Sequence, residues 1–286
     1  MIQSLKQIKN RIKSIENTRK VTSAMQMVSI AKLNRVEKQL AGAKPYFQRL
    51  DSLLSHLIAD MGDTKNSFLE ERAKKEKIAL CVVTSDSGLC GMYNNVVIRF
   101  AEDFIMKQGG GNVKLIVIGK KGYNYFRSKK ITIEHSYLGL QGRYSEKTSD
   151  EIAQKLMSIY SGRLADEVYI TYTKFSAAYM HKPVMMKVLN VCPEQKNVRP
   201  VNYILEPGKE RILEELVERY IFTKVRFVLL EAFASEHTSR VMAMKTATDN
   251  ARDLLAQLTL LRNKVRQASI TQDIMEIISS ADALKG

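Results

Sequence analysis

One loop carries the residues best placed for chemistry. Residues 85–91 read Ser-Asp-Ser-Gly-Leu-Cys-Gly and join a predicted strand to a predicted helix. In nucleotide-binding α/β folds the phosphate loop takes this position, because backbone N–H groups at a helix N-terminus bind anions. The spacing here is G-x-x-G, which is neither G-x-G-x-x-G nor a P-loop, and no Walker lysine follows. A tight turn or a protein contact is therefore favoured over a phosphate site.

The cysteines and histidines do not assemble into a recognisable reactive site. Cys81, Cys90 and Cys192 are widely spaced and odd in number, so they predict neither a disulfide framework nor a CxxC metal site. The four histidines lack metal-ligand spacing. Cys90 is flanked by glycines, but no histidine is near it in sequence, which favours a small buried side chain over a nucleophile. The sequence predicts no catalytic residue, no cofactor and no metal.

Positive charge is concentrated at the N-terminus. The chain has 45 Lys and Arg against 30 Asp and Glu, a net charge of +15; residues 1–50 hold eleven basic and two acidic residues (+9), and residues 209–286 twelve and eleven (+1). Such a face is either a solvated helix surface or a contact for nucleic acid, anionic lipid or an acidic protein. Residues 1–45 contain no aromatic side chain for base stacking, which weakens the nucleic-acid interpretation.

The two ends of the chain have the pattern of very long helices. Residues 1–41 and 209–285 contain neither glycine nor proline, which cost ~1 and ~3 kcal/mol in a helix interior. We expect helices at about residues 2–58 and 209–283, with the continuity of the first left open by Gly42 and Pro45. Apolar residues follow steps of three and four, as a coiled-coil seam does. The predicted seam residues include Ile8, Val21, Met25, Val28, Leu258, Leu261 and Met275.

The centre of the chain has the pattern of an α/β sheet. Short apolar runs predict strands at residues 78–84, 113–118, 167–173 and 183–189, and helices are expected at 93–107, 123–128 and 145–161. Alternation of strands and helices indicates a mostly parallel, right-handed sheet. The predicted fold is thus α/β: a long antiparallel coiled coil of the N- and C-terminal helices with an inserted small Rossmann-like domain. The expected division is 1–60, 75–207 and 208–286.

Three segments resemble one known family. Residues 11–33 (RIKSIENTRKVTSAMQMVSIAKL), 84–95 (TSDSGLCGMYNN) and 234–277 (ASEHTSRVMAMKTATDNARDLLAQLTLLRNKVRQASITQDIMEI) resemble the gamma subunit of F-type ATP synthases, in the right order. The resemblance implies a central rotor stalk without an active site, since catalysis in that family takes place on the beta subunits. It also implies one copy per complex, with the alpha and beta hexamer, the epsilon subunit and the c-subunit ring as partners.

The resemblance also implies functional positions. Contacts with alpha and beta are expected from Arg19, Lys20, Met25, Arg266 and Gln267, and contacts of the foot with the c ring or epsilon from Tyr203 and Glu206. The family usually has a basic residue where this chain has Ser87, so a charge contact from that position is not expected. The implied location is the bacterial plasma membrane, peripheral on its cytoplasmic side.

Two other function classes stay open at this point. One is a basic coiled-coil protein that binds nucleic acid, because the sequence pI is about 9.6. The other is a nucleotide-dependent enzyme built on the α/β module. The segment 267–283 carries isoleucines with little charge, which predicts that a partner covers it.

Overall fold

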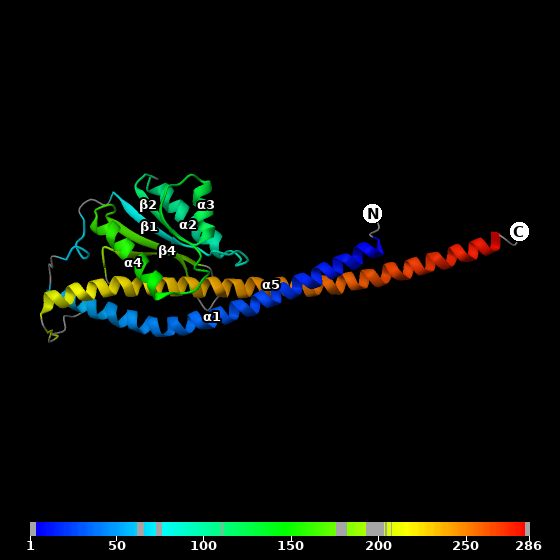
Figure 1. Cartoon of the computed structure of the whole chain (residues 1–286), viewed down its shortest axis with the longest axis horizontal. Helices are drawn as coiled ribbons and strands as arrows, with labels where there is room; N and C mark the ends of the chain where they lie inside the picture. Colours follow the sequence, from blue (N-terminus) through cyan, green and yellow to red (C-terminus); the bar gives the residue numbers. More distant parts are fainter. Residues whose placement is uncertain are drawn as a thin grey trace. The chain divides into compact units, whose positions relative to one another are not determined.

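The computed structural model describes residues 4–61, 66–72, 76–109, 111–175, 182–192, 203, 205–206 and 208–283. The chain divides into two compact units: unit 1 comprises Met1–Val28 with Val241–Gly286, and unit 2 comprises Ser29–Arg240. Helices α1 (Leu5–Met61) and α5 (Lys209–Ala283) each contribute to both units (Figure 1). The division at residues 1–60, 75–207 and 208–286 stays a prediction. Within the described residues, none of the helices has a stretch apolar enough to cross a membrane.

Helix α1 runs unbroken through Gly42 and Pro45, which settles the question that the sequence left open. A proline inside a helix removes one hydrogen bond and costs roughly 3 kcal/mol. Apolar burial on both sides offsets this cost: Leu40, Phe47 and Leu50 are each at most 8% exposed. Tertiary packing therefore keeps a helix that local propensity alone would interrupt.

The seam of unit 1 differs from the predicted stripe. Val21 and Val28 are each 58% exposed, so their placement in the seam was wrong, as it was for Leu261 and Met275. Thr22 is buried instead, and Thr248 Oγ1 on α5 donates a hydrogen bond to Thr22 Oγ1 at 2.8 Å. The described contact between the two helices at this point is thus a hydrogen bond between small hydroxyl side chains and involves neither valine. Ile8 and Leu258 are buried as predicted.

Unit 2 contains a sheet of five strands in the order β3-β2-β1-β4-β5. The strands are β1 (Ile78–Val83), β2 (Val113–Ile118), β3 (Ile133–Tyr137), β4 (Glu167–Lys174) and β5 (Lys182–Leu189). The helices between them are α2 (Tyr93–Lys107), α3 (Lys120–Ser128) and α4 (Glu146–Ser161). All pairings are parallel except β4 with β5. Strand β3 was not predicted, because its residues are half polar and it lies at the edge of the sheet.

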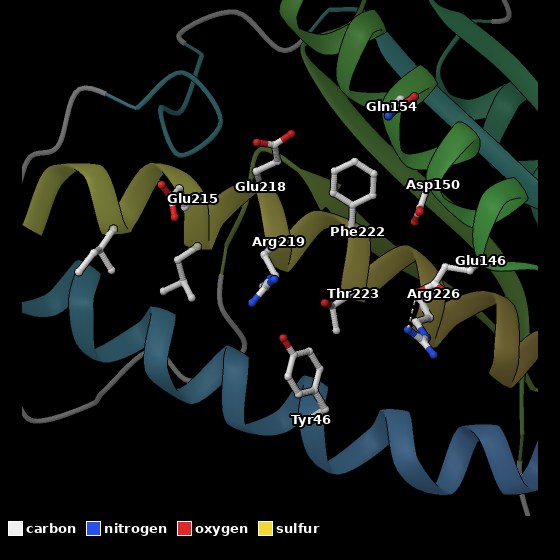
Figure 2. Close-up of a pocket in the computed structure, with 12 residues that line it drawn as sticks. Tyr46, Glu146, Asp150, Gln154, Glu215, Glu218, Arg219, Phe222, Thr223 and Arg226 are labelled. Atoms are coloured by element: carbon white, nitrogen blue, oxygen red, sulfur yellow. Dashed lines mark hydrogen bonds and ion pairs between the residues drawn. The ribbon is translucent and has the colours of Figure 1, made fainter. Parts of the chain in front are cut away.

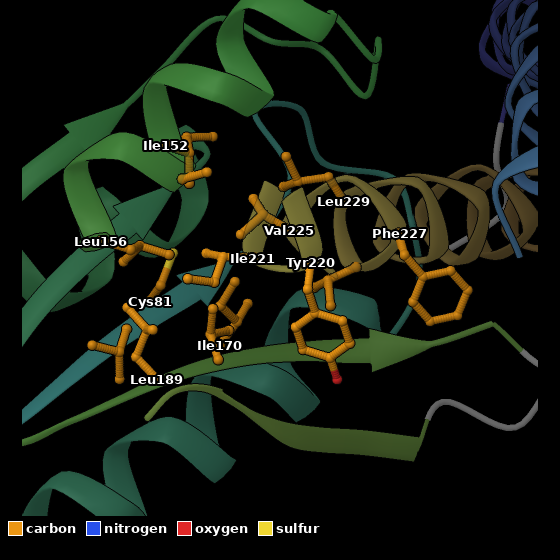
Figure 3. Close-up of a cluster of buried hydrophobic side chains, with 14 of the residues drawn as sticks. Cys81, Ile152, Leu156, Ile170, Leu189, Tyr220, Ile221, Val225, Phe227 and Leu229 are labelled. Carbon is orange, nitrogen blue, oxygen red and sulfur yellow. The ribbon is translucent and has the colours of Figure 1, made fainter. Parts of the chain in front are cut away.

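The two faces of the sheet pack against different helices. Alternate residues of β1 divide between them: Leu80 and Val82 meet α2 and α3, whereas Cys81 and Val83 meet α4, α5 and α1. Figure 3 shows Ile221 and Val225 of α5 among strand residues such as Ile170. Helix α5 is therefore part of the core of the sheet as well as a partner of α1.

Within unit 2, α1 and α5 run antiparallel. Lys209 Nζ lies 2.6 Å from Asp60 Oδ2, and Tyr220 Oη donates to Asp51 Oδ1 at 2.7 Å, so numbers fall on one helix as they rise on the other. The Phe47 and Phe227 rings stack with centroids 5.0 Å apart. Offset aromatic stacking and a buried hydrogen bond fix the register of the pair.

Two glycines permit close approaches that other residues would block. Gly119, at the end of β2, has φ of 94°, and a Cβ there would overlap the carbonyl oxygen of Thr84. Gly142 has φ of 65°, and a Cβ there would lie 2.7 Å from the His237 ring of α5. His237 is fully buried, and its Nε2 lies 2.8 Å from the Gly142 carbonyl, so this nitrogen carries the proton and donates.

We predict that Gly119→Ala lowers the free energy of unfolding by at least about 3 kcal/mol, because backbone strain and a clash with backbone atoms add together. The matched control is Gly139→Ala: Gly139 has φ of 85° but no atom within 4 Å of the added Cβ. The control variant introduces backbone strain without a clash, so its free energy of unfolding should fall by only about 1–2 kcal/mol. Urea unfolding of both variants measures the difference, and equal losses would contradict the packing explanation.

The buried imidazole makes stability depend on pH. Burial lowers the pKa of His237 to about 4, with Arg240 and Lys32 acting in the same direction. The folded chain then binds fewer protons than the unfolded chain between the ordinary histidine pKa of about 6.5 and the folded value, so stability falls as the pH drops through this window. We expect this histidine to account for a loss of about 2 kcal/mol between pH 7 and pH 4.5. In the variant His237→Gln the side chain keeps a donor and an acceptor but does not titrate. The free energy of unfolding of this variant should therefore vary less between pH 7 and pH 4.5. Equal pH dependence in both proteins would refute this assignment.

Candidate functional site

The loop at residues 85–91 holds an arginine of the same chain. Arg240 of α5 donates from Nη2 to the Ser87 carbonyl at 3.2 Å and to Ser87 Oγ at 3.1 Å, and from Nε to the Gly88 carbonyl at 3.4 Å. The loop thus presents oxygen acceptors, which bind a cation and would repel a phosphate. Among the described residues, this geometry favours a structural turn, held by a contact within the same chain, over the phosphate site.

Three side chains of α5, Glu236, His237 and Arg240, form what we call the Arg240 cluster. Arg240 Nη1 lies 2.8 Å from Glu236 Oε1, with the two side chains 7% and 1% exposed. Burial raises the pKa of Glu236, although the adjacent Arg240 acts in the opposite direction. Arg240 Nη1 also lies 3.3 Å from His237 Nδ1, which accepts because the other ring nitrogen donates to Gly142. The cluster joins two loops to one helix.

Asp86 joins the same loops to each other. Its Oδ1 accepts the N–H groups of Lys120 and Gly139, each at 3.0 Å, and its Oδ2 accepts the N–H of Gln141 at 2.6 Å. From α1, Lys32 Nζ donates to the Gln141 carbonyl at 3.2 Å. The carboxyl ends of β1, β2 and β3 are therefore tied together at one point, by contacts that hold backbone rather than a substrate.

Cys90 lies in this region but is not arranged as a nucleophile. It is 2% exposed, and Asn94 Nδ2 donates to its Sγ at 3.1 Å. Burial raises the pKa of the thiol, which disfavours the reactive thiolate. The buried, structural interpretation of Cys90 is therefore favoured. No group of three or more His, Cys, Asp or Glu able to hold a metal ion is found in the described part of the chain.

A cleft of about 390 Å³ lies between α1 and α5 within unit 1. Its lining carries three cations and one exposed methionine, Met27, which is 68% exposed. The lining residues are Arg19, Lys20, Ser23, Ala24, Met27, Thr248 and Arg252. Cations beside a soft apolar side chain suit a partner surface that combines carboxylates with apolar groups.

The cleft contains some of the expected contact residues and not others. Arg19 and Lys20 line it, but Met25 does not: it is only partly exposed, because it lies closer than Met27 to the face that holds Thr22. Sequence reasoning missed Met27 and Arg252. Met27 lies five residues after Thr22, so on a helix its side chain points well away from the seam. This spacing could have identified Met27 as an exposed contact residue.

The end of α5 is exposed on all sides in the described residues. Arg266 and Gln267 are exposed, as is every residue through Ser280. The apolar side chains Ile270, Ile274, Met275, Ile277 and Ile278 are 50–69% exposed. A contiguous apolar surface of this kind marks a site of protein contact.

The expected foot residues lie in unit 2. Tyr203 is 37% exposed, and its ring meets that of His56 edge-on with centroids 6.1 Å apart. Glu206 is exposed. The structure thus leaves both side chains available for contact, near the ends of α1 and α5 that pair through Asp60 and Lys209.

A second cleft, of about 810 Å³, lies between α1, α4 and α5 within unit 2. Figure 2 shows Glu146 and Asp150 of α4 opposite α5, with Arg226 paired to Glu146 at 3.3 Å. The described lining includes no histidine, cysteine or serine, and its carboxylates are distributed along two helices. The cleft therefore has the character of a surface groove and presents no arrangement of nucleophile and base.

The chain is similar to known proteins over nearly its full length. A family model for ATP synthase matches residues 4–284. The chain is 38% identical over 284 residues to the ATP synthase gamma chain of Pelotomaculum thermopropionicum, covering 99% of both chains. It is 37% identical over 290 residues to that of Heliobacterium modesticaldum, covering 98% of this chain and 99% of the relative.

Solved structures share the fold. A chain of the Euglena gracilis mitochondrial ATP synthase (OSCP/F1/c-ring) matches with a TM-score of 0.67 at 14% identity, over 98% of this chain and 94% of that one. A chain of the Tetrahymena thermophila central stalk and c-ring matches with a TM-score of 0.60 at 22% identity, over 79% and 99%. The long helices with an inserted α/β sheet are thus an ATP synthase central-stalk fold, and the chain belongs to the family of ATP synthase gamma chains.

Proposed function

We propose that this chain is the central rotor stalk of an F-type ATP synthase. Its antiparallel helices transmit rotation of the c-subunit ring to the hexamer of alpha and beta subunits, driving ATP synthesis, or run in reverse on hydrolysis. The observation that carries the proposal is the surface of unit 1, where a stiff helix pair presents cations and apolar side chains on a chain of gamma-family sequence. The chain is a non-catalytic subunit, and we place the catalytic sites on the beta subunits.

The partners follow from the same assignment. The Euglena and Tetrahymena structures that share the fold contain an F1 part or a central stalk together with a c-ring. We propose the alpha and beta subunits, the c ring and the epsilon subunit as partners of this chain, with one copy per complex. The complex is membrane-bound and this subunit is peripheral; its location on the cytoplasmic side of a bacterial plasma membrane is part of the proposal.

Specific contacts are assigned to the two units. The cleft beside Arg19 and Lys20 receives the acidic lever loop of a beta subunit, with Met25 next to it on α1. Arg266 and Gln267 make polar contacts with beta further along α5, since both are exposed. Tyr203 and Glu206 face the c ring or epsilon.

Weak individual contacts suit a rotating shaft. An exposed ion pair contributes only about 0–1 kcal/mol, so the lever loop can engage and release as the shaft turns. A methionine adds adaptable apolar contact without a fixed geometry. Tight, deeply buried contacts at this surface would hold one rotary position and stop the cycle.

The exposed end of α5 has a different role. Its isoleucines Ile270, Ile274, Ile277 and Ile278 follow the spacing of one helix face, and every side chain of residues 266–280 is exposed. This arrangement suits a sleeve of apolar residues that surrounds the helix and contacts that face as the helix turns. We propose that the hexamer provides this sleeve and that it serves as a bearing.

The nucleic-acid-binding alternative has little support. The family match covers residues 4–284, and the N-terminal segment lacks aromatic side chains. Co-purification of the chain with alpha and beta subunits, followed by an ATPase assay of the complex, tests the proposal. A chain that forms no complex with these subunits would refute it.

Met25→Lys should reduce coupling more than assembly, because it adds a cation beside the lever loop and strengthens a contact that must release. The measurement is the number of protons pumped per ATP hydrolysed in membrane vesicles. Met27→Lys should have the larger effect, since Met27 lines the cleft and Met25 does not. Met106→Lys, on α2 and equally exposed at 67%, is the control. An unchanged ratio in both the Met25→Lys and the Met27→Lys variant would count against the assignment.

Removal of residues 277–286 should leave a folded and partly active shaft. The last described side chains of this stretch make no buried contact, so the truncation removes bearing surface without opening the core. Circular dichroism checks the fold, and co-purification with alpha and beta subunits checks assembly. Loss of binding to the hexamer on this deletion would show that the tip is an anchor.

A further inference from the structure

We propose that Arg240 is a positioning residue that locks the α/β sheet of unit 2 to helix α5, so that rotation of the sheet turns the helix without slip. This inference rests on the proposed rotor function and adds to it one residue through which force passes, beside the buried contact of Tyr172 Oη on β4 with Glu231 Oε2 on α5 at 2.6 Å. Arg240 is the last residue of unit 2, and α5 continues from it into unit 1. Arg240 therefore contacts the loops of the sheet at the point where α5 leaves unit 2.

The first support is the place that Arg240 occupies. In doubly wound sheets, ligands bind at the carboxyl ends of parallel strands, where the strand order reverses. Here the order β3-β2-β1-β4-β5 reverses at β1, and the loop after β1 receives the Arg240 guanidinium. The chain thus uses a position suited to a bound ligand to hold its own helix.

The second support is that both loops connect to the same cluster. Arg240 binds Ser87 and Gly88 in one loop, while its neighbour His237 donates to Gly142 in the other. Asp86 ties the two loops together. A displacement of either loop therefore stretches hydrogen bonds to α5 directly.

The third support is the kind of interaction. Apolar packing is not directional, so a helix held only by apolar contacts resists sliding and rotation weakly until its side chains interlock. The planar guanidinium makes hydrogen bonds in a fixed fork, and these weaken steeply with angle. Such bonds resist rotation of α5 about its own axis, which is the motion that must be prevented.

Stability alone does not account for the cluster. A buried ion pair often contributes no more than apolar residues of the same size would. The Glu236 and Arg240 side chains are nevertheless almost wholly buried. A requirement for one fixed orientation of helix and sheet explains why charged groups stand where apolar ones would pack as well.

The test is Arg240→Ala in the assembled complex in membrane vesicles, with guanidinium as a chemical replacement. We expect the protons pumped per ATP hydrolysed to fall by about threefold or more while ATP hydrolysis continues, since coupling mutations act on this scale. Millimolar guanidinium chloride should restore the ratio by filling the space between Glu236 and the loop carbonyls. Urea, which has a similar shape but no charge, should not.

Two further variants keep the result interpretable. Arg226→Ala removes a different contact of α5, the ion pair with Glu146 of α4; its two side chains are 44% and 72% exposed, so pumping should be normal. If Arg240→Ala does not assemble, Arg240→Lys provides the test, because lysine keeps the positive charge but lacks the planar set of hydrogen-bond donors. This variant should assemble and pump few protons per ATP hydrolysed. Normal pumping in the Arg240 variant that assembles would overturn the proposal. A loss of pumping no larger than that of Arg226→Ala would overturn it as well. Failure of the unmodified chain to join alpha and beta subunits would instead refute the rotor function.

Discussion

Helix α5 is shared between two packing partners, and the rest of the structure depends on how it is buried. Between Tyr220 and His237 almost every side chain is buried, whether it faces the sheet or α1; only Phe222 and Arg226 are half-buried. A helix that is apolar on all sides is stable only inside a core. The sheet therefore cannot be separated from the helix pair without exposing this surface, which makes unit 2 one mechanical body.

Apolar packing alone does not determine the register and the orientation of α5, and polar contacts fix both. Tyr220 and Asp51 fix the register of α5 against α1, and the Arg240 cluster fixes its orientation against the loops of the sheet. The helix side chains of these contacts are buried, so leaving any of them without a partner is costly. In unit 1 the balance is different: the threonine contact is small, and the surface around it is cationic and open. The chain is thus rigid where it gathers force and adaptable where partners would act on it.

The sequence predicted the long helices and most of the sheet because their signals are local. Absence of glycine and proline and a regular apolar spacing can be read in one segment at a time. Strand β3 was missed because an edge strand needs no continuous apolar run. Val21 and Val28 were misplaced because the identity of the seam residues depends on which faces two distant segments present to each other, and here Thr22 makes the contact.

The candidate site was harder to predict than the fold. The loop at residues 85–91 was recognised as unusual, but the residue that fills it is more than 150 positions away, at Arg240. Such a pairing becomes visible only when the topology brings both segments to one edge of the sheet. His237 was likewise noted only as a histidine without metal-ligand neighbours, since its role depends on Gly142.

Rotation of this chain inside a fixed hexamer tests the account most directly. Cys192 is exposed whereas Cys81 and Cys90 are buried, so a bead can be attached through Cys192 of the assembled complex. With the hexamer held on a surface and ATP supplied, the account predicts sustained rotation of the bead in one direction. A bead that stays still while the same complexes hydrolyse ATP would contradict it.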